Sequence, residues 1–210
     1  MNPKIYHIIH IDNLPSVIKD GFLYSDAYMR QISKCHSTIG MNKIKDRRLT
    51  IPIAFLPDLN VGECVPFYFC PRSVMLYILY RGNHPDIHYC EGQDPIVHLE
   101  ADMRKTVNWA KSNNLSWAFT DSNASSSYFE SFSDLNCLDK IDWDAVQATD
   151  WRNPYVNEKK QAEFLIENMF PWQLVERIGV FSYIQQNQVE SIVDKAIHKP
   201  CVKIQKSWYY

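Results

Sequence analysis

The sequence predicts one α+β domain with a central mixed or antiparallel sheet and short helices. Its 210 residues are the length of a single domain, and 46% hydrophobic with 13% aromatic residues can build a substantial core. Short strand-like and helical runs follow one another irregularly, which is typical of α+β folds. No repeat, low-complexity tract or linker interrupts residues 1–210, so we expect an undivided domain.

Strands are predicted where β-branched and aromatic residues alternate or run together over about four to eight positions. The run at 65–73 is bounded by Pro71 near its end, and the run inside 159–166 alternates apolar residues with Glu163 and Leu165. The other predicted strands are, in order, 5–11, 22–24, 96–99, 117–121, 178–182 and 201–204.

Helices are predicted where apolar residues recur every three or four positions. Asp12 is the expected N-cap of the first, whose apolar stripe begins at Leu14, and Gly21 suits its C′ position. Residues 25–61 have weak periodicity, and segments of this length in compact domains are often lids or binding elements. The other predicted helices are 43–48, 73–80, 102–112, about 129–135 and 189–197.

The composition excludes several classes of function. The net charge of −2 gives no overall attraction to nucleic acid or membrane, so a nucleic-acid site must be a local patch. No apolar run reaches the roughly 20 residues of a membrane helix, and the N-terminus lacks a signal-peptide pattern, so we expect a cytoplasmic protein. The six cysteines are interpreted as free thiols. His84, His88 and Cys90 have no fourth ligand nearby, so no metal is expected.

Three features of the sequence each allow two interpretations. Glu163 is either a Glu on a half-wet edge strand or a catalytic carboxylate at the mouth of a cleft, because a buried charge needs a partner or ligand. His7 lies in the first strand as a core histidine, which the pattern favours, or as a ligand contact. The basic run Lys43, Lys45, Arg47 and Arg48 is a solvated helix face or a phosphate clamp.

These residues suit one reaction in particular. The chain has only six glycines and no Gly-rich phosphate loop, nucleophile elbow or zinc motif. One strand Glu, one strand His and one arginine suit cleavage of an N-glycosidic bond in a dinucleotide. An ionised carboxylate near the sugar stabilises an oxocarbenium-like transition state, and a guanidinium neutralises the pyrophosphate.

Six pieces of the chain match a known family, namely residues 5–14, 65–73, 119–121, 159–165, 170–172 and 208–210. Together they resemble the DarT family of bacterial toxins, which ADP-ribosylate a base in single-stranded DNA. The resemblance implies an ADP-ribosyltransferase fold related to poly(ADP-ribose) polymerases, NAD as the donor substrate without a metal, and thymidine as acceptor. It also implies a macrodomain antitoxin, DarG, that removes the modification and binds the toxin.

The resemblance also implies roles for individual residues. Glu163 matches the catalytic glutamate, and Arg48 matches the arginine of the NAD-binding element, with a second, catalytic role. Residues 25–61 correspond to that NAD-binding or lid element. The residues implied to line the cofactor site are His7, Ile8, Ile9, Ser16 and Tyr24.

Residues 122–163 match the region that reads the DNA substrate. Asn123 stands where family members can carry His, two residues after the Thr-Asp pair, and its amide can still hydrogen-bond a base. Asn123, Lys159 and Lys160 are therefore expected DNA contacts, with Lys43 and Lys45 adding to a salt-sensitive basic patch.

Three alternative functions remain open from the sequence. A tRNA 2′-phosphotransferase-like enzyme would share the fold and NAD, but its 2′-phosphate calls for extra basic residues that this acidic chain lacks. An NAD glycohydrolase would consume NAD without DNA. A non-catalytic nucleic-acid-binding module would leave NAD intact.

Overall fold

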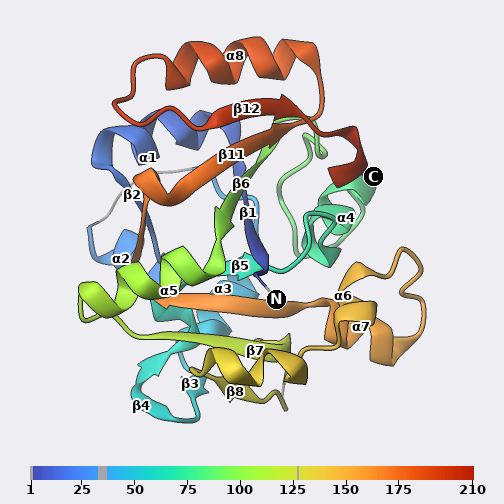
Figure 1. Cartoon of the computed structure of the whole chain (residues 1–210). Coiled ribbons are helices and arrows are strands. Elements are labelled where there is room, and N and C mark those ends of the chain that lie inside the picture. Colours follow the sequence, from blue (N-terminus) through green and yellow to red (C-terminus); the bar gives the residue numbers. More distant parts are fainter. Residues whose placement is uncertain (1, 33–36, 127) are drawn as a thin grey trace.

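An eight-stranded mixed sheet forms the centre of the computed structural model, which describes residues 2–32, 37–126 and 128–210 (Figure 1). The strand order is β12-β11-β6-β1-β5-β9-β7-β8, and only β11 and β12 pair in parallel. The strands are β1 (Lys4–His10), β5 (Cys64–Tyr68), β6 (Ile96–Asp102), β7 (Trp117–Asn123), β8 (Ser131–Phe132), β9 (Ala162–Glu167), β11 (Val175–Val180) and β12 (Cys201–Ile204).

Two small sheets lie beside the large one. They pair β2 (Phe22–Tyr24) with β10 (Met169–Pro171), and β3 (Pro52–Ile53) with β4 (Leu56–Asn60). In Figure 1, β3 and β4 lie at the same end of the molecule as β7 and β8, and helix α8 (Tyr183–Val193) lies at the opposite end beside β12. Strands and helices are thus interspersed, and the α+β class is confirmed.

The helices are short, and side-chain caps fix where several begin. The Ser73 hydroxyl accepts from the Leu76 amide at the start of α4, and the Ser25 hydroxyl accepts from the Tyr28 amide at α2. No described helix is long and apolar enough to cross a membrane. The helices are α1 (Leu14–Asp20), α2 (Asp26–Gln31), α3 (Asn42–Arg48), α4 (Val74–Arg81), α5 (Met103–Ser112), α6 (Trp143–Gln147), α7 (Pro154–Lys160) and α8 (Tyr183–Val193).

Two local predictions were wrong. A 3₁₀ turn precedes α1, so its N-cap is Asn13 rather than Asp12, although Gly21 ends the helix with φ 75° as expected. The segment predicted as a helix near 129–135 contains β8 instead. There Phe132 pairs with Phe119 of β7, their ring centroids 5.4 Å apart, so a cross-strand aromatic contact overrides a coincidental helical spacing.

The core lies on both faces of the sheet at β9. Phe164 packs with Phe67 and Phe119 in the main cluster, whereas Leu165 packs on the other face with Ala118 and Val61. Because side chains alternate along a strand, Glu163 shares the face of Leu165. Strand β9 lies between β5 and β7, so it is an interior strand and the expected half-wet edge is wrong.

Candidate active site

Glu163 is buried and held by a two-pronged ion pair. The side chain of Arg48, the last residue of α3, reaches it with Nη1 at 3.0 Å from Oε1 and Nη2 at 2.7 Å from Oε2. Glu163 is 3% exposed. Two parallel charge-assisted hydrogen bonds fix the plane of the carboxylate as well as its charge. The structure thus brings together the two residues predicted to be catalytic, which are 115 positions apart in the chain.

The end of α3 is held in place by a glycine. A Cβ at Gly62 would lie 2.8 Å from the backbone nitrogen of Leu49 and 2.9 Å from the carbonyl carbon of Arg48. Any larger residue would force the backbone at Arg48 and Leu49 to shift. Gly62 is therefore a positioning residue that the periodicity of the sequence did not single out, because its role depends on a contact between distant segments.

The loop after β7 is pinned to Glu163. The Thr120 hydroxyl accepts from the Glu163 amide at 3.0 Å and donates to the Ser122 carbonyl at 2.6 Å. The β7–β9 register shifts between Phe119 and Asn123, which brings the Ala124 amide to 3.4 Å from Glu163 Oε1. A backbone donor and a guanidinium thus face the same carboxylate oxygen.

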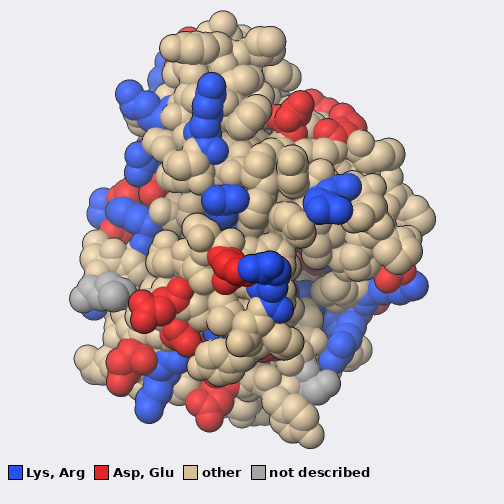
Figure 2. All heavy atoms as spheres, turned by 90° about the vertical axis from the view of Figure 1, so that its right-hand side faces the viewer, with Lys and Arg blue, Asp and Glu red and all other residues tan. Residues whose placement is uncertain are grey.

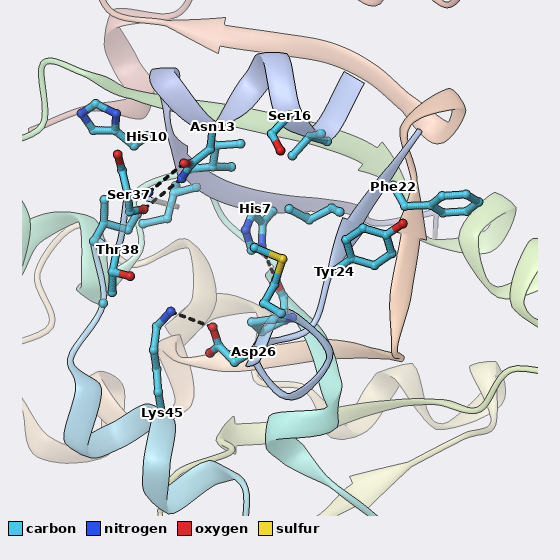
Figure 3. A pocket seen from close by; sticks show the side chains of 18 of the residues that line it. His7, His10, Asn13, Ser16, Phe22, Tyr24, Asp26, Ser37, Thr38 and Lys45 are labelled. Atoms are coloured by element: carbon cyan, nitrogen blue, oxygen red, sulfur yellow. Dashed lines mark hydrogen bonds and ion pairs between the residues drawn. The ribbon is translucent and has the colours of Figure 1, made fainter. Parts of the chain in front are cut away.

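A cavity of about 200 Å³ opens beside this pair (Figure 3). Its walls include His7, Ile8, Ile9, Ser16 and Tyr24, which are the residues predicted to line the cofactor site. Figure 3 shows Tyr24 and Phe22 of β2 on one side, Ser37 and Thr38 on the other, and His7 between them. Arg48 does not line this cavity, so the structure places it with Glu163 instead of with the predicted cofactor wall.

Tyr68 joins the cavity to the ion pair. It lines the cavity and is the cross-strand partner of Glu163, and its neighbour Pro66, also in the wall, pairs with Leu165. Directly paired residues point to the same face, so the side chains of Tyr68 and Glu163 lie next to each other on one face of the sheet. Burial and the Glu163 carboxylate raise the pKa of Tyr68, which keeps its hydroxyl protonated as a donor. The sequence did not single out Tyr68, which is identified as a site residue by its pairing with Glu163 and its place in the cavity wall.

His7 presents a neutral imidazole to the cavity. Its Nδ1 lies 2.7 Å from the Pro66 carbonyl oxygen, which only accepts, so Nδ1 carries the proton and Nε2 is free to accept. Burial lowers the pKa of His7, despite the raising effect of the Pro66 carbonyl. His7 is therefore a polar contact in the wall rather than a cation.

Part of the segment 25–61, the predicted NAD-binding or lid element, lines the cavity, including Asp26, Met29 and Lys45, and residues 33–36 lie outside the described part of the chain. Asp26 at the start of α2 accepts from Lys45 of α3 at 2.7 Å across the mouth (Figure 3). The Asn13 amide donates to the Ser37 carbonyl and accepts from the Ser37 amide, both at 2.9 Å. These contacts attach the segment to α1 and to itself.

The predicted DNA contacts are engaged within the protein. The Asn123 amide donates to Gln161 Oε1 at 2.9 Å, and Lys159 pairs with Asp121. Lys160 is 3% exposed and donates to the Val146 carbonyl at 2.8 Å. Lys43 pairs with Asp86, and Lys45 with Asp26. The predicted basic patch is therefore not a set of free surface cations, because Lys43, Lys45 and Lys159 are paired with carboxylates and Lys160 is buried.

Metal ligands do not gather anywhere in the described residues, in which no group of three or more His, Cys, Asp or Glu is placed to hold an ion. The five cysteines in this part of the chain, Cys64, Cys70, Cys90, Cys137 and Cys201, are free thiols, and Cys35 lies outside it.

Comparison with known proteins decides the family. The sequence pattern described as "ssDNA thymidine ADP-ribosyltransferase, DarT" matches residues 6–210. The chain belongs to the DarT family. It is therefore an enzyme that uses NAD to ADP-ribosylate single-stranded DNA, and the three alternative functions are set aside.

Individual DarT relatives agree over nearly the whole chain. A Thermus aquaticus protein named DNA ADP-ribosyl transferase is 38% identical over 208 residues, which cover 98% of this chain and 88% of that protein. The structure of Thermus sp. 2.9 DarT in complex with ADP-ribosylated ssDNA superposes with a TM-score of 0.88 at 36% identity, covering 99% of this chain and 96% of that one. The same protein in complex with NAD+ gives a TM-score of 0.80 at 35% identity, with coverage of 99% and 98%. The chain thus has the ADP-ribosyltransferase fold of DarT.

Proposed function

We propose that Glu163, oriented by Arg48, stabilises the ribose of NAD in the transition state while a thymine of single-stranded DNA takes the ADP-ribose. The observation that supports this assignment is the Arg48–Glu163 fork beside the cavity lined by His7, Ile8 and Ile9. A cavity of about 200 Å³ suits the nicotinamide riboside end of NAD, since whole small-molecule sites run to roughly 300–1,000 Å³.

In this reaction the bond between nicotinamide nitrogen and ribose C1 breaks, and its electron pair leaves with nicotinamide. The thymine N3 lone pair forms the new bond to C1, and the N3 proton passes to solvent. Positive charge develops on the sugar only as nicotinamide leaves, so the Glu163 carboxylate binds the transition state more tightly than NAD. A carboxylate has about four acceptor positions, so with Arg48 bound it can still accept from a ribose hydroxyl.

Arg48 acts through its charge and its geometry. Burial alone would lower the pKa of Arg48, but the Glu163 carboxylate outweighs burial and raises the pKa. The guanidinium therefore stays protonated and does not remove the thymine proton. It orients the carboxylate and offsets negative charge that develops on the thymine carbonyls as the N3 proton leaves.

Single strands should be modified and duplexes should not. A paired thymine has its N3 edge engaged and its ring stacked, so it cannot approach C1 of a ribose in a cavity without leaving the helix. With NAD labelled in its adenosine half, we expect a thymine-containing strand to be labelled, and the rate to fall by about tenfold or more once the complement is annealed. Equal labelling of both forms would contradict the proposed approach of the base.

A macrodomain glycohydrolase of the DarG type is the proposed partner that removes the modification. In Thermosipho africanus a protein 25% identical over 93% of this chain is named a DNA ADP-ribosyl transferase–DNA ADP-ribosyl glycohydrolase fusion, and the match covers 46% of that protein. We place the enzyme in the cytoplasm as a toxin, in keeping with the free thiols of its described cysteines.

A further inference from the structure

A second cavity has a volume of about 330 Å³. Its walls are the segment that follows β5, the end of α6 with the segment after it, the end of α7 and residues 207 and 210, with Arg72, Trp151, Lys160 and Tyr210 among them. It shares no lining residue with the cavity assigned to NAD. Of the residues given a role above, Lys160, an expected DNA contact, is among those that line it.

The chain on either side of the reacting pair leads to this second cavity. Tyr68 and Glu163 are cross-strand partners, and the cavity is lined by Cys70, two residues after Tyr68, and by Lys160, the last residue of α7, three residues before Glu163. Two residues of chain span at most about 7 Å and three at most about 11 Å. A nucleotide bound there is therefore within reach of a thymidine placed at Glu163.

Aromatic rings form one wall. Trp151 meets Tyr77 with centroids 4.9 Å apart at 89°, and Tyr77 meets Tyr210 at 5.0 Å and 64°. The Tyr210 hydroxyl donates to the carbonyl oxygens of Arg72 and Ser73 at 3.1 and 3.3 Å, which holds its ring in place. Trp151 is half-buried, so part of its indole is accessible. Fixed aromatic rings of this kind are what single-stranded nucleic acids stack on.

Cationic donors occupy the wall without an anion. The Lys160 ammonium donates to two neutral acceptors, the Val146 carbonyl at 2.8 Å and Cys70 Sγ at 3.6 Å. The Arg72 guanidinium lies 4.3 Å from the centre of the Tyr210 ring, and its Nε is buried with no hydrogen-bond partner. No Asp or Glu of the described chain lines this cavity. A buried ammonium and an unpaired donor favour a ligand with hydrogen-bond acceptors.

Figure 2 faces the side of the molecule that carries α4, α6, α7 and the C-terminus. Lys and Arg are spread over it in small groups between uncharged residues and acidic ones, without a continuous basic stripe. Recognition at the second cavity therefore depends on a discrete aromatic and cationic pocket rather than on a general phosphate track.

We propose that this cavity binds the base of the nucleotide next to the modified thymidine and so contributes to sequence selection. The base stacks against Trp151, and its acceptor edge faces Lys160 and Arg72. This assignment rests on the proposed function, because only a single-stranded DNA substrate supplies such a neighbour. Trp151 and Lys160 are specificity-determining residues in this account.

The test compares the parent enzyme with Trp151→Ala on a set of short strands that contain one thymidine. In each strand one nucleotide near the thymidine is replaced by an abasic unit. We expect the parent kcat/KM to fall about ten- to a hundredfold at one adjacent position, the range of stacking losses. Trp151→Ala should lose a similar factor on the intact strand and nothing further at that abasic position. Its NAD affinity and thermal melt should match the parent.

Two further variants keep the test decisive. Tyr155→Ala removes an exposed ring of α7 that does not line the cavity, and it should keep the parent pattern. Lys160→Met keeps the length of the side chain without its charge and should change which base is preferred at that position. Two outcomes would overturn this assignment and leave the proposed function standing. In one, the parent enzyme labels every strand equally well, whichever flanking base is replaced. In the other, the loss in kcat/KM from Trp151→Ala and the loss from the abasic unit multiply when the two changes are combined. Failure of the parent to label any strand would overturn the proposed function and this assignment with it.

Discussion

Glu163→Gln should lower the rate of DNA ADP-ribosylation on the order of a hundred- to a thousandfold, or about 3–4 kcal/mol, the usual cost of losing one transition-state electrostatic contact. Gln keeps the shape of the side chain and one oxygen that can accept from Arg48, but it lacks the charge that offsets the developing cation. NAD affinity should change little, because that charge appears only as nicotinamide leaves. Initial rates of labelling and calorimetry with NAD measure the two effects.

A matched control lies on the same strand. Glu167 ends β9 and accepts from the Ser116 amide at 2.8 Å, away from Arg48. Glu167→Gln keeps that oxygen, so it should label DNA at the parent rate. Glu163→Asp should retain little activity, because it moves the carboxylate back and errors of about 1 Å can cost a hundredfold. Parent-level labelling by Glu163→Gln would end the catalytic assignment.

Folding must be measured alongside the rates. Replacing a solvent-exposed Glu in a cleft would leave the free energy of unfolding unchanged. Glu163, however, is 3% exposed and paired with Arg48. Glu163→Ala leaves that guanidinium without its partner, and breaking a buried pair in this way typically costs about 3–5 kcal/mol. Gln is therefore the informative substitution, and its thermal melt should stay much closer to that of the parent than the melt of Glu163→Ala.

Arg48→Lys is the second large effect, with an expected loss in turnover of about a hundredfold. Lysine keeps the positive charge but cannot make two parallel bonds to Glu163, so the carboxylate loses its fixed plane. Because Arg48 contacts Glu163 and does not line the cavity proposed to bind NAD, we expect turnover to fall while NAD affinity holds. Steady-state rates and NAD calorimetry on the same preparation separate these effects.

Arg47→Lys provides the control for this substitution. Arg47 is the exposed neighbour of Arg48 on α3, and the same change there should leave turnover at the parent level. Weakened NAD affinity in Arg48→Lys with normal turnover at saturation would instead assign Arg48 to pyrophosphate binding. Near-normal values for both quantities in Arg48→Ala would remove Arg48 from the site.

Much of the architecture could be predicted because it is encoded in local pattern. The alternation of apolar residues identified β9, and Gly21 marked the end of α1. The burial of Glu163 could not be predicted in this way, because it depends on β9 lying between β5 and β7. The strand β8 was missed because its two residues are defined by pairing with β7 rather than by period.

The same distinction between local pattern and long-range contacts applies to the site residues. The residue pattern offered Glu163, His7 and Arg48 as candidates with two interpretations each, and the resemblance to DarT assigned their roles. Tyr68 and Gly62 act through contacts between segments distant in the chain, which periodicity does not report. The lysines expected to hold DNA were chosen by charge alone, and the structure shows that carboxylate partners and burial decide which cations are free.

Labelling of DNA from NAD tests the central claim most directly. The parent enzyme and Glu163→Gln are each incubated with adenosine-labelled NAD and either a thymine-containing single strand or the same strand with every thymine replaced by cytosine. We predict label on the thymine-containing strand with the parent enzyme, and little or none in the other three combinations. Consumption of NAD with no label on either strand, or label that does not depend on thymine or on Glu163, would contradict the account.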